Sequence, residues 1–170
     1  MKLVNSRNKG AAFERVIVNK INTLLESKGL NDRVKRNLDQ YQTKGMADVY
    51  WNNFAIECKR YKSSAKKTMY KNEWWQQVVE SAGDNLIPIL IYKYDRRDIM
   101  CVVPLFLVTS VETPNWECTY LCPLTEICDR LDEILQKQMD LNSYLYDEIS
   151  TIFVGRPTKE SKLLVMSLAS

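Results

Sequence analysis

Residues 45–60 read GMADVYWNNFAIECKR, and this stretch decides the fold. It contains two runs rich in β-branched and aromatic residues, at 47–51 and 54–58, which are separated by Asn52-Asn53. An Asn-Asn pair between two such runs is typical of a tight turn, so the runs are expected to form an antiparallel hairpin.

The rest of the chain supplies further helices and strands, distinguished by apolar spacing near 3.6 or 2 residues. The predicted elements are a helix over Gly10–Lys28, a strand over Arg33–Leu38, a helix over Glu73–Gly83, strands over Leu86–Tyr94, Ile99–Leu105 and Glu117–Leu121, and helices over Leu124–Lys137 and Leu141–Ile152. The order is a helix, three strands, a helix, two strands and then an appended strand and helices, which predicts an α/β fold with helices packed on a sheet. We expect a single domain over residues 1–170, with a core at about 5–105 and a C-terminal strand and helical extension at about 106–170.

The composition of the chain excludes several classes of protein. The longest apolar run, residues 99–108, is too short to cross a bilayer, and the start of the chain has no apolar signal region. We therefore expect a cytoplasmic protein with reduced thiols and no membrane partner. Cys118, Cys122 and Cys128 could form a loose zinc cluster, although their spacing suits ordinary half-buried thiols better. The chain contains no histidine, which excludes Ser-His-Asp and Cys-His hydrolases and histidine-based metal nucleases.

The predicted hairpin brings acidic residues together. Alternation along its second strand sends Glu57 and Lys59 to the same face, and the turn folds this strand against the one that carries Asp48. Two carboxylates can then converge on one hard cation, with the Cys58 carbonyl as a further ligand. Lys59 could polarise an attacking water and offset charge in a phosphoryl transition state.

Glu14 is a third acidic candidate. At about 100° per residue it lies inside the apolar arc of its own helix, where a carboxylate is costly unless it is paired or bound to a cation. The alternative is that the helix dipole and solvent stabilise this charge in the first turn.

Charge is distributed unevenly along the chain. Residues 1–71 hold 16 Lys and Arg against 6 Asp and Glu, a net of +10, whereas residues 72–170 hold 8 and 15, a net of −7. The basic half suggests a polyanionic partner, and an uneven solvated surface is the alternative. A cationic segment follows the hairpin and could neutralise DNA phosphates or only aid solubility; it comprises Lys59, Arg60, Lys62, Lys66, Lys67 and Lys71.

Three segments resemble the PD-(D/E)XK nuclease superfamily: RNKGAAFER at 7–15, GMAD at 45–48 and IECK at 56–59. The resemblance is closest to archaeal-type and phage-encoded Holliday-junction resolvases, and it covers about residues 5–105. It implies a restriction-endonuclease-like fold, a mixed β-sheet flanked by helices whose core runs helix, three strands, helix and strand. It also implies a protein encoded by a phage and working in a bacterial cytoplasm. It also implies Mg²⁺ as the cofactor, with Mn²⁺ able to substitute, and hydrolysis of DNA phosphodiesters.

The resemblance also implies roles for individual residues. Glu14 would be the helix-borne acid of the metal site, Asp48 and Glu57 the metal ligands, and Lys59 the catalytic lysine. Gln76 or Gln77 would be an auxiliary polar residue on the following helix. Together with the basic segment, the predicted DNA contacts are Arg7, Lys9, Arg15, Arg36, Arg60, Lys62, Lys66 and Lys67.

Three functions remain open at this stage. The first is a homodimeric resolvase of branched DNA, acting in recombination and repair. The second is a restriction- or repair-type nuclease that cuts linear duplex DNA, and the third is a non-catalytic DNA-binding module. Trp74 is expected either to stack on unpaired bases or to join the core, whereas the phase of Trp75 places it in the core.

Overall fold

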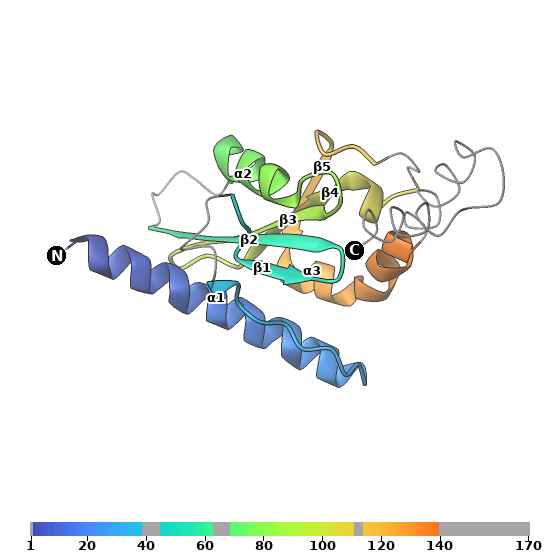
Figure 1. The fold of residues 1–170 in the computed structure, drawn as a ribbon, viewed down its shortest axis with the longest axis horizontal. Helices are drawn as coiled ribbons and strands as arrows, with labels where there is room; N and C mark the ends of the chain where they lie inside the picture. The colour runs from blue at the N-terminus through green and yellow to red at the C-terminus, as the bar shows by residue number, and fades with distance from the viewer. Residues whose placement is uncertain (1, 39–44, 63–68, 111–113, 140–170) are drawn as a thin grey trace, which may run out of the picture.

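A five-stranded mixed β-sheet lies between helices on both faces in the computed structural model, which describes residues 2–38, 45–62, 69–110 and 114–139 (Figure 1). The strands are β1 (Val49–Trp51), β2 (Phe54–Tyr61), β3 (Ile87–Tyr94), β4 (Met100–Pro104) and β5 (Thr119–Pro123). The helices are α1 (Lys2–Ser27), α2 (Asn72–Ala82), α3 (Leu124–Asp129), the 3-10 helix η2 (Leu105–Leu107) and a helical stretch at 131–139. The predicted α/β class and restriction-endonuclease-like arrangement are confirmed.

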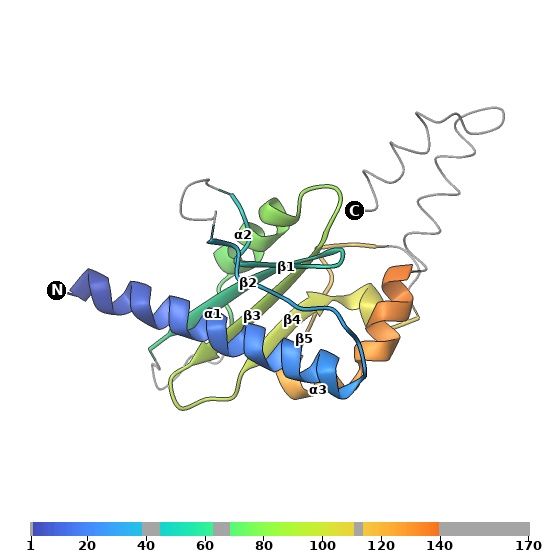
Figure 2. The ribbon, with the colours of Figure 1, turned by 60° about the horizontal axis from the view of Figure 1, so that its bottom comes forward.

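The strands follow one another across the sheet in the order β1-β2-β3-β4-β5 (Figure 2). Only β2 and β3 are parallel, because α2 carries the chain back between them, and the other neighbours are antiparallel. The predicted hairpin joins β1 to β2, and Asn52 adopts a φ of 49° in its turn, a conformation that asparagine tolerates well. The hairpin is therefore formed where the sequence places it.

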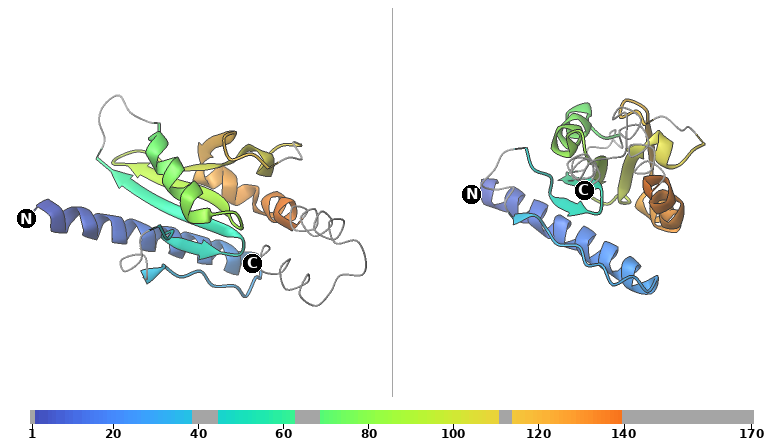
Figure 3. Two further views of the ribbon diagram at one scale, coloured as in Figure 1. Left: turned by 45° about the horizontal axis from the view of Figure 1, so that its top comes forward. Right: turned by 45° about the vertical axis from the view of Figure 1, so that its right-hand side comes forward.

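The two faces of the sheet are covered by different helices (Figure 3). One face packs on α1 and α3 and buries alternate β2 residues, including Phe54 and Ile56, in the larger core cluster. The opposite face packs on α2, where Trp74, Trp75 and Val78 contact residues of β3 and β4. Because side chains alternate along a strand, the β2 residues between those of the first face point toward α2. These residues are Ala55, Glu57, Lys59 and Tyr61.

Helix α1 begins earlier than predicted, at Lys2 instead of Gly10. The prediction followed the first regular apolar positions, starting at Phe13, whereas the helix continues beyond them toward the N-terminus (Figure 2). Residues 2–9 include several good helix formers and no proline. Gly10, which follows them, costs the helix only about 1 kcal/mol. Among the described residues, no helix is long and apolar enough to span a membrane.

The strand predicted over Arg33–Leu38 is wrong, because this segment forms only an isolated bridge between Arg36 and Val49. Hydrogen bonds from side chains hold much of this segment to the rest of the fold instead. Asn22 of α1 accepts from the Val34 N–H at 2.7 Å and donates to the Val34 carbonyl at 3.0 Å. The Asn37 N–H donates to the Asp48 carbonyl at 2.7 Å. The segment therefore runs back alongside α1 and is held between this helix and β1 (Figure 3).

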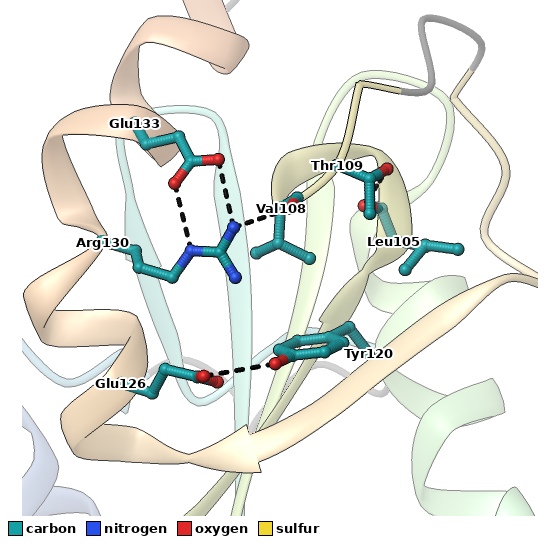
Figure 4. A network of polar contacts seen from close by, with 7 residues as sticks. All are labelled: Leu105, Val108, Thr109, Tyr120, Glu126, Arg130 and Glu133. Atoms are coloured by element: carbon teal, nitrogen blue, oxygen red, sulfur yellow. Dashed lines mark hydrogen bonds and ion pairs between the residues drawn. The ribbon is translucent and has the colours of Figure 1, made fainter.

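A polar network holds the C-terminal described elements together (Figure 4). Arg130, in the turn after α3, donates to the Val108 carbonyl at 2.6 Å and pairs with Glu133 at 3.0 Å. The Tyr120 hydroxyl of β5 donates to Glu126 at 3.2 Å. The helix predicted over Leu124–Lys137 is divided by a turn at Arg130. The Arg130 side chain connects the helical stretch that follows this turn to the end of η2. The helix predicted over Leu141–Ile152 lies outside the described residues.

Candidate active site

The hairpin places two acidic residues opposite each other. The β1–β2 register pairs Val49 with Ile56, and its continuation by one residue sets Asp48 opposite Glu57. Side chains in directly opposite positions of an antiparallel pair share one face of the sheet. Both residues are buried, at 6% and 3% exposure, so neither carboxylate is a solvated surface group.

A backbone hydrogen bond fixes Asp48. Its Oδ2 accepts from the Cys58 N–H at 2.7 Å, beyond the last residue pair of β1 and β2. The carboxylate thus occupies the place that a strand carbonyl would take if β1 continued. This bond holds the Asp48 side chain against β2, directly beside the residues that flank Cys58.

Glu57, Lys59 and Gln77 form a closed triangle of polar contacts. Glu57 Oε1 lies 3.0 Å from Lys59 Nζ and accepts from Gln77 Nε2 at 2.6 Å. Gln77 Oε1 in turn accepts from Lys59 Nζ at 2.8 Å. The other oxygen, Glu57 Oε2, is buried and has no hydrogen-bond partner within the described structure. A buried carboxylate oxygen of this kind calls for a ligand such as a water or a cation.

Glu14 is buried and engaged by Arg36. The carboxylate lies on the sheet-facing side of α1, with the residue 7% exposed. Arg36 Nε and Nη2 both lie 2.7 Å from Glu14 Oε2, and the Arg36 side chain is 15% exposed. Arg36 was predicted as a DNA contact, which stays a prediction; in the structure its guanidinium binds the Glu14 carboxylate in a part-buried position.

The electrostatic environment couples these acids. The pKa of Asp48 is raised to about 7, first because burial disfavours the carboxylate and then because of negative charge on Glu57 and Glu14. Burial also raises the pKa of Glu57, although Lys59 acts in the opposite direction. Three carboxylates therefore share a site with two cations, Arg36 and Lys59, and Asp48 has the least compensated charge.

These residues fit a hard divalent cation. Such a cation would lower the pKa of Asp48 and give Glu57 Oε2 a partner, and Mg²⁺ commonly needs only one or two protein carboxylates with water as the remaining ligands. In the described part of the chain, no three His, Cys, Asp or Glu side chains form a complete metal-binding group on their own. This finding argues against the zinc cluster of Cys118, Cys122 and Cys128. The predicted ligand set of Asp48, Glu57, the Cys58 carbonyl and Glu14 stays a prediction. Asp48 and Glu57 lie opposite each other in the hairpin, whereas Glu14 comes from α1 and contacts Arg36.

The remaining predicted residues are placed as follows. Arg7, Lys9 and Arg15 are exposed on α1, and Lys9 Nζ lies 3.9 Å from Asp95. Arg60 and Lys62 are exposed at and after the end of β2, and Arg60 Nε donates to Asp95 at 3.2 Å. Lys66 and Lys67 lie outside the described residues.

The side chains of the two glutamines of α2 lie in different surroundings. Gln77 contacts the site, whereas Gln76 lines a separate cavity with Trp75 and Asn53. Trp74 is buried at 6% exposure, so of the two alternatives left open for it the structure supports a place in the core. Sequence reasoning did not find the contact of Arg36 with Glu14, because nothing in the local pattern relates two residues so far apart in the chain.

Comparison with known proteins identifies the family. Residues 5–121 match the family described as "Phage putative PDDEXK endonuclease". The chain belongs to this family. The matched range of this PD-(D/E)XK endonuclease contains Glu14, Asp48, Glu57, Lys59 and Gln77. No curated protein and no solved structure matches the chain.

The family match confirms the predicted membership of the PD-(D/E)XK superfamily and indicates a phage nuclease that acts on DNA. PD-(D/E)XK nucleases generally use divalent metal ions, in agreement with the donor set of Asp48 and Glu57. The preference for branched DNA, the identity of the ion and the homodimer stay predictions.

The burial of Asp48 predicts an unusual pH dependence of stability in the metal-free protein. Because its pKa is raised to about 7, the folded state binds this proton more tightly than the unfolded state between about pH 4 and 7. The contribution of Asp48 to stability is therefore lost as pH rises through this window. Asp48→Asn should stabilise the metal-free protein at pH 8 by about 2 kcal/mol, or roughly 5 °C in Tm.

Thermal unfolding in EDTA from pH 5 to pH 8 measures this effect. The gap between Asp48→Asn and the unsubstituted protein should widen as pH rises, and no histidine titrates in this range to obscure it. The exposed Asp98 offers a control, because Asp98→Asn should leave Tm within about 1 °C. An Asp48→Asn protein less stable at every pH would contradict the assignment of an uncompensated charge to Asp48.

Proposed function

We propose that this PD-(D/E)XK protein is a Mg²⁺-dependent endonuclease that nicks branched DNA, in the manner of a Holliday-junction resolvase. One observation carries the metal dependence: a buried oxygen of Glu57 without a hydrogen-bond partner in the described structure lies beside Asp48, whose charge Lys59 offsets less than burial and Glu57 disfavour it. Burial of two such carboxylates is costly unless a cation joins them.

Each side chain then has a chemical task. Asp48 and Glu57, with the Cys58 carbonyl, would hold the ion, which supplies Lewis-acid activation of water and of the scissile phosphate. Lys59 would hold a water or a phosphate oxygen through its ammonium group, whose position is set by Glu57 Oε1 and Gln77 Oε1. Glu14 would add negative charge near the ion, with Arg36 moderating that charge.

The preference for branched DNA rests on charge and shape. Phosphate contacts by exposed basic residues of α1 and β2 would give affinity without reading base sequence. Arg7, Arg15 and Lys62 are such residues. A homodimer would place two sites on one junction, because a two-fold symmetric enzyme matches a substrate with two equivalent strands to cut.

A panel of labelled substrates tests the proposal. A four-way junction, a linear duplex and a single strand of the same sequence are incubated with Mg²⁺, Mn²⁺ or Ca²⁺. We expect paired nicks in the junction with Mg²⁺ or Mn²⁺ and no cleavage with Ca²⁺. Equal cutting of the linear duplex would favour a restriction- or repair-type nuclease over a resolvase. Binding to DNA without cleavage under every metal would contradict the enzymatic proposal and favour a DNA-binding module.

A further inference from the structure

An exposed aromatic ring stands at the end of the strand that carries Glu57 and Lys59. Tyr61 is the last residue of β2 and is 45% exposed. By the alternation of the strand, its side chain lies on the same face as that of Lys59, roughly 7 Å further along. Among the aromatic side chains that the structure describes, that of Tyr61 is the most exposed. It lies next to the candidate active site.

The Tyr61 ring packs against a cluster of buried aromatic side chains. The Tyr61 and Trp74 ring centroids are 4.9 Å apart with an interplanar angle of 39°. Trp74 is itself fixed in the core by Tyr92 and Tyr94, at centroid distances of 5.9 and 6.1 Å. The Tyr61 ring therefore rests on a rigid cluster, and fixing it against a ligand would cost little side-chain entropy.

Positive charge accompanies the ring. Lys71 Nζ lies 4.7 Å from the Tyr61 ring centroid and 5.6 Å from that of Trp74. Arg60 and Lys62 flank Tyr61 in the chain. The nearby acid, Asp95, is engaged by Arg60 at 3.2 Å, which offsets its charge. A ligand that suits this surface has a flat π-face and carries negative charge, and a nucleotide combines both.

We infer that Tyr61 is a stacking platform for a nucleobase that lies outside the duplex stack, next to the phosphate bound at Lys59. The inference rests on the proposed function and names the DNA feature that the site selects. Both faces of a base within a duplex are covered by its neighbours, so only an unstacked base, at a branch point or a bulge, can use the platform. Stacking at Tyr61 would therefore favour distorted DNA without any reading of sequence.

Binding measurements in Ca²⁺ test the platform without needing cleavage. The ligands are a duplex with one unpaired 2-aminopurine and the same duplex fully paired. Tyr61→Leu should weaken binding to the duplex with the unpaired base about tenfold and change binding to the paired duplex less than twofold. Tyr61→Phe keeps the ring and should preserve both affinities. The unsubstituted protein and Tyr61→Phe should move the 2-aminopurine out of the duplex stack and so change its fluorescence, and Tyr61→Leu should change it much less.

The outcomes separate this inference from the proposed function. An equal loss of affinity for both duplexes in Tyr61→Leu, or the same fluorescence change with Tyr61→Leu as with the unsubstituted protein, would overturn the platform. Met69→Ala, a change at another exposed apolar residue, is the control and should alter neither affinity. If no substrate is cleaved under any metal while the Tyr61-dependent difference persists, the platform stands and the proposed cleavage fails.

Discussion

Asp48→Ala should reduce junction cleavage by at least about 10³-fold while leaving DNA binding in Ca²⁺ within about threefold. The loss corresponds to about 4 kcal/mol of transition-state stabilisation, the scale expected when a metal ligand is removed. Binding persists because the exposed basic residues of α1 and β2 are unchanged. Single-turnover cleavage of a labelled four-way junction at saturating Mg²⁺ measures the rate, and titration of the same junction in Ca²⁺ measures binding.

Glu57→Ala should behave in the same way, because the two carboxylates are expected to hold one ion. Lys59→Met should lower the rate without abolishing metal binding, since its ammonium group contacts Glu57 and Gln77 and is not itself a metal ligand. Asp98→Ala is the matched control, since Asp98 is an exposed aspartate, and it should cleave normally. Full activity in Asp48→Ala would refute the proposed site.

Arg36→Met should destabilise the fold by about 3 kcal/mol, the second large effect that the structure predicts. The substitution removes both contacts at 2.7 Å and leaves the Glu14 carboxylate, 9% exposed, without this partner. Breaking one side of a buried ion pair costs far more than the pair contributes, because a desolvated charge is left behind. Urea unfolding without metal measures the loss.

A double-mutant cycle separates the ion pair from simple packing. Adding Glu14→Gln to Arg36→Met should recover at least about 1 kcal/mol, since the buried negative charge that Arg36 paired with is then removed. Arg33→Met is the control: Arg33 lies in the same segment, is exposed, and donates to the nearby carbonyls of Leu30 and Asp32. If Arg36→Met cost no more than Arg33→Met, the ion pair would have no structural importance.

The hairpin and the helix α2 could be predicted from sequence because their patterns are local. The Asn52-Asn53 turn fixes which residues of β1 and β2 face each other, so Asp48 and Glu57 follow from it directly. Apolar spacing likewise placed α2 within one residue of its observed ends. The choice between Gln76 and Gln77 required the structure, because neighbouring helix positions point about 100° apart.

The contacts of Arg36 and Trp74 depend on tertiary structure and could not be predicted in this way. The segment after α1 has strand-like composition, but Asn22 and Asn37 satisfy its backbone and attach it with a single bridge to Val49. The two tryptophans of α2 both pack inward because β3 presents aromatic residues to them. Only the arrangement of the sheet decides these outcomes.

The candidate active site takes its residues from α1, the β1–β2 hairpin and α2, three parts that lie apart in the sequence. The hairpin carries both carboxylates and the Lys59 ammonium group, and Gln77 of α2 contacts Glu57 and Lys59, so this ammonium group takes its full set of contacts when α2 packs on the sheet. Recovery of DNA cleavage during refolding would then report the formation of the α2–sheet interface. Cleavage would begin only in molecules in which α2 has packed on the sheet.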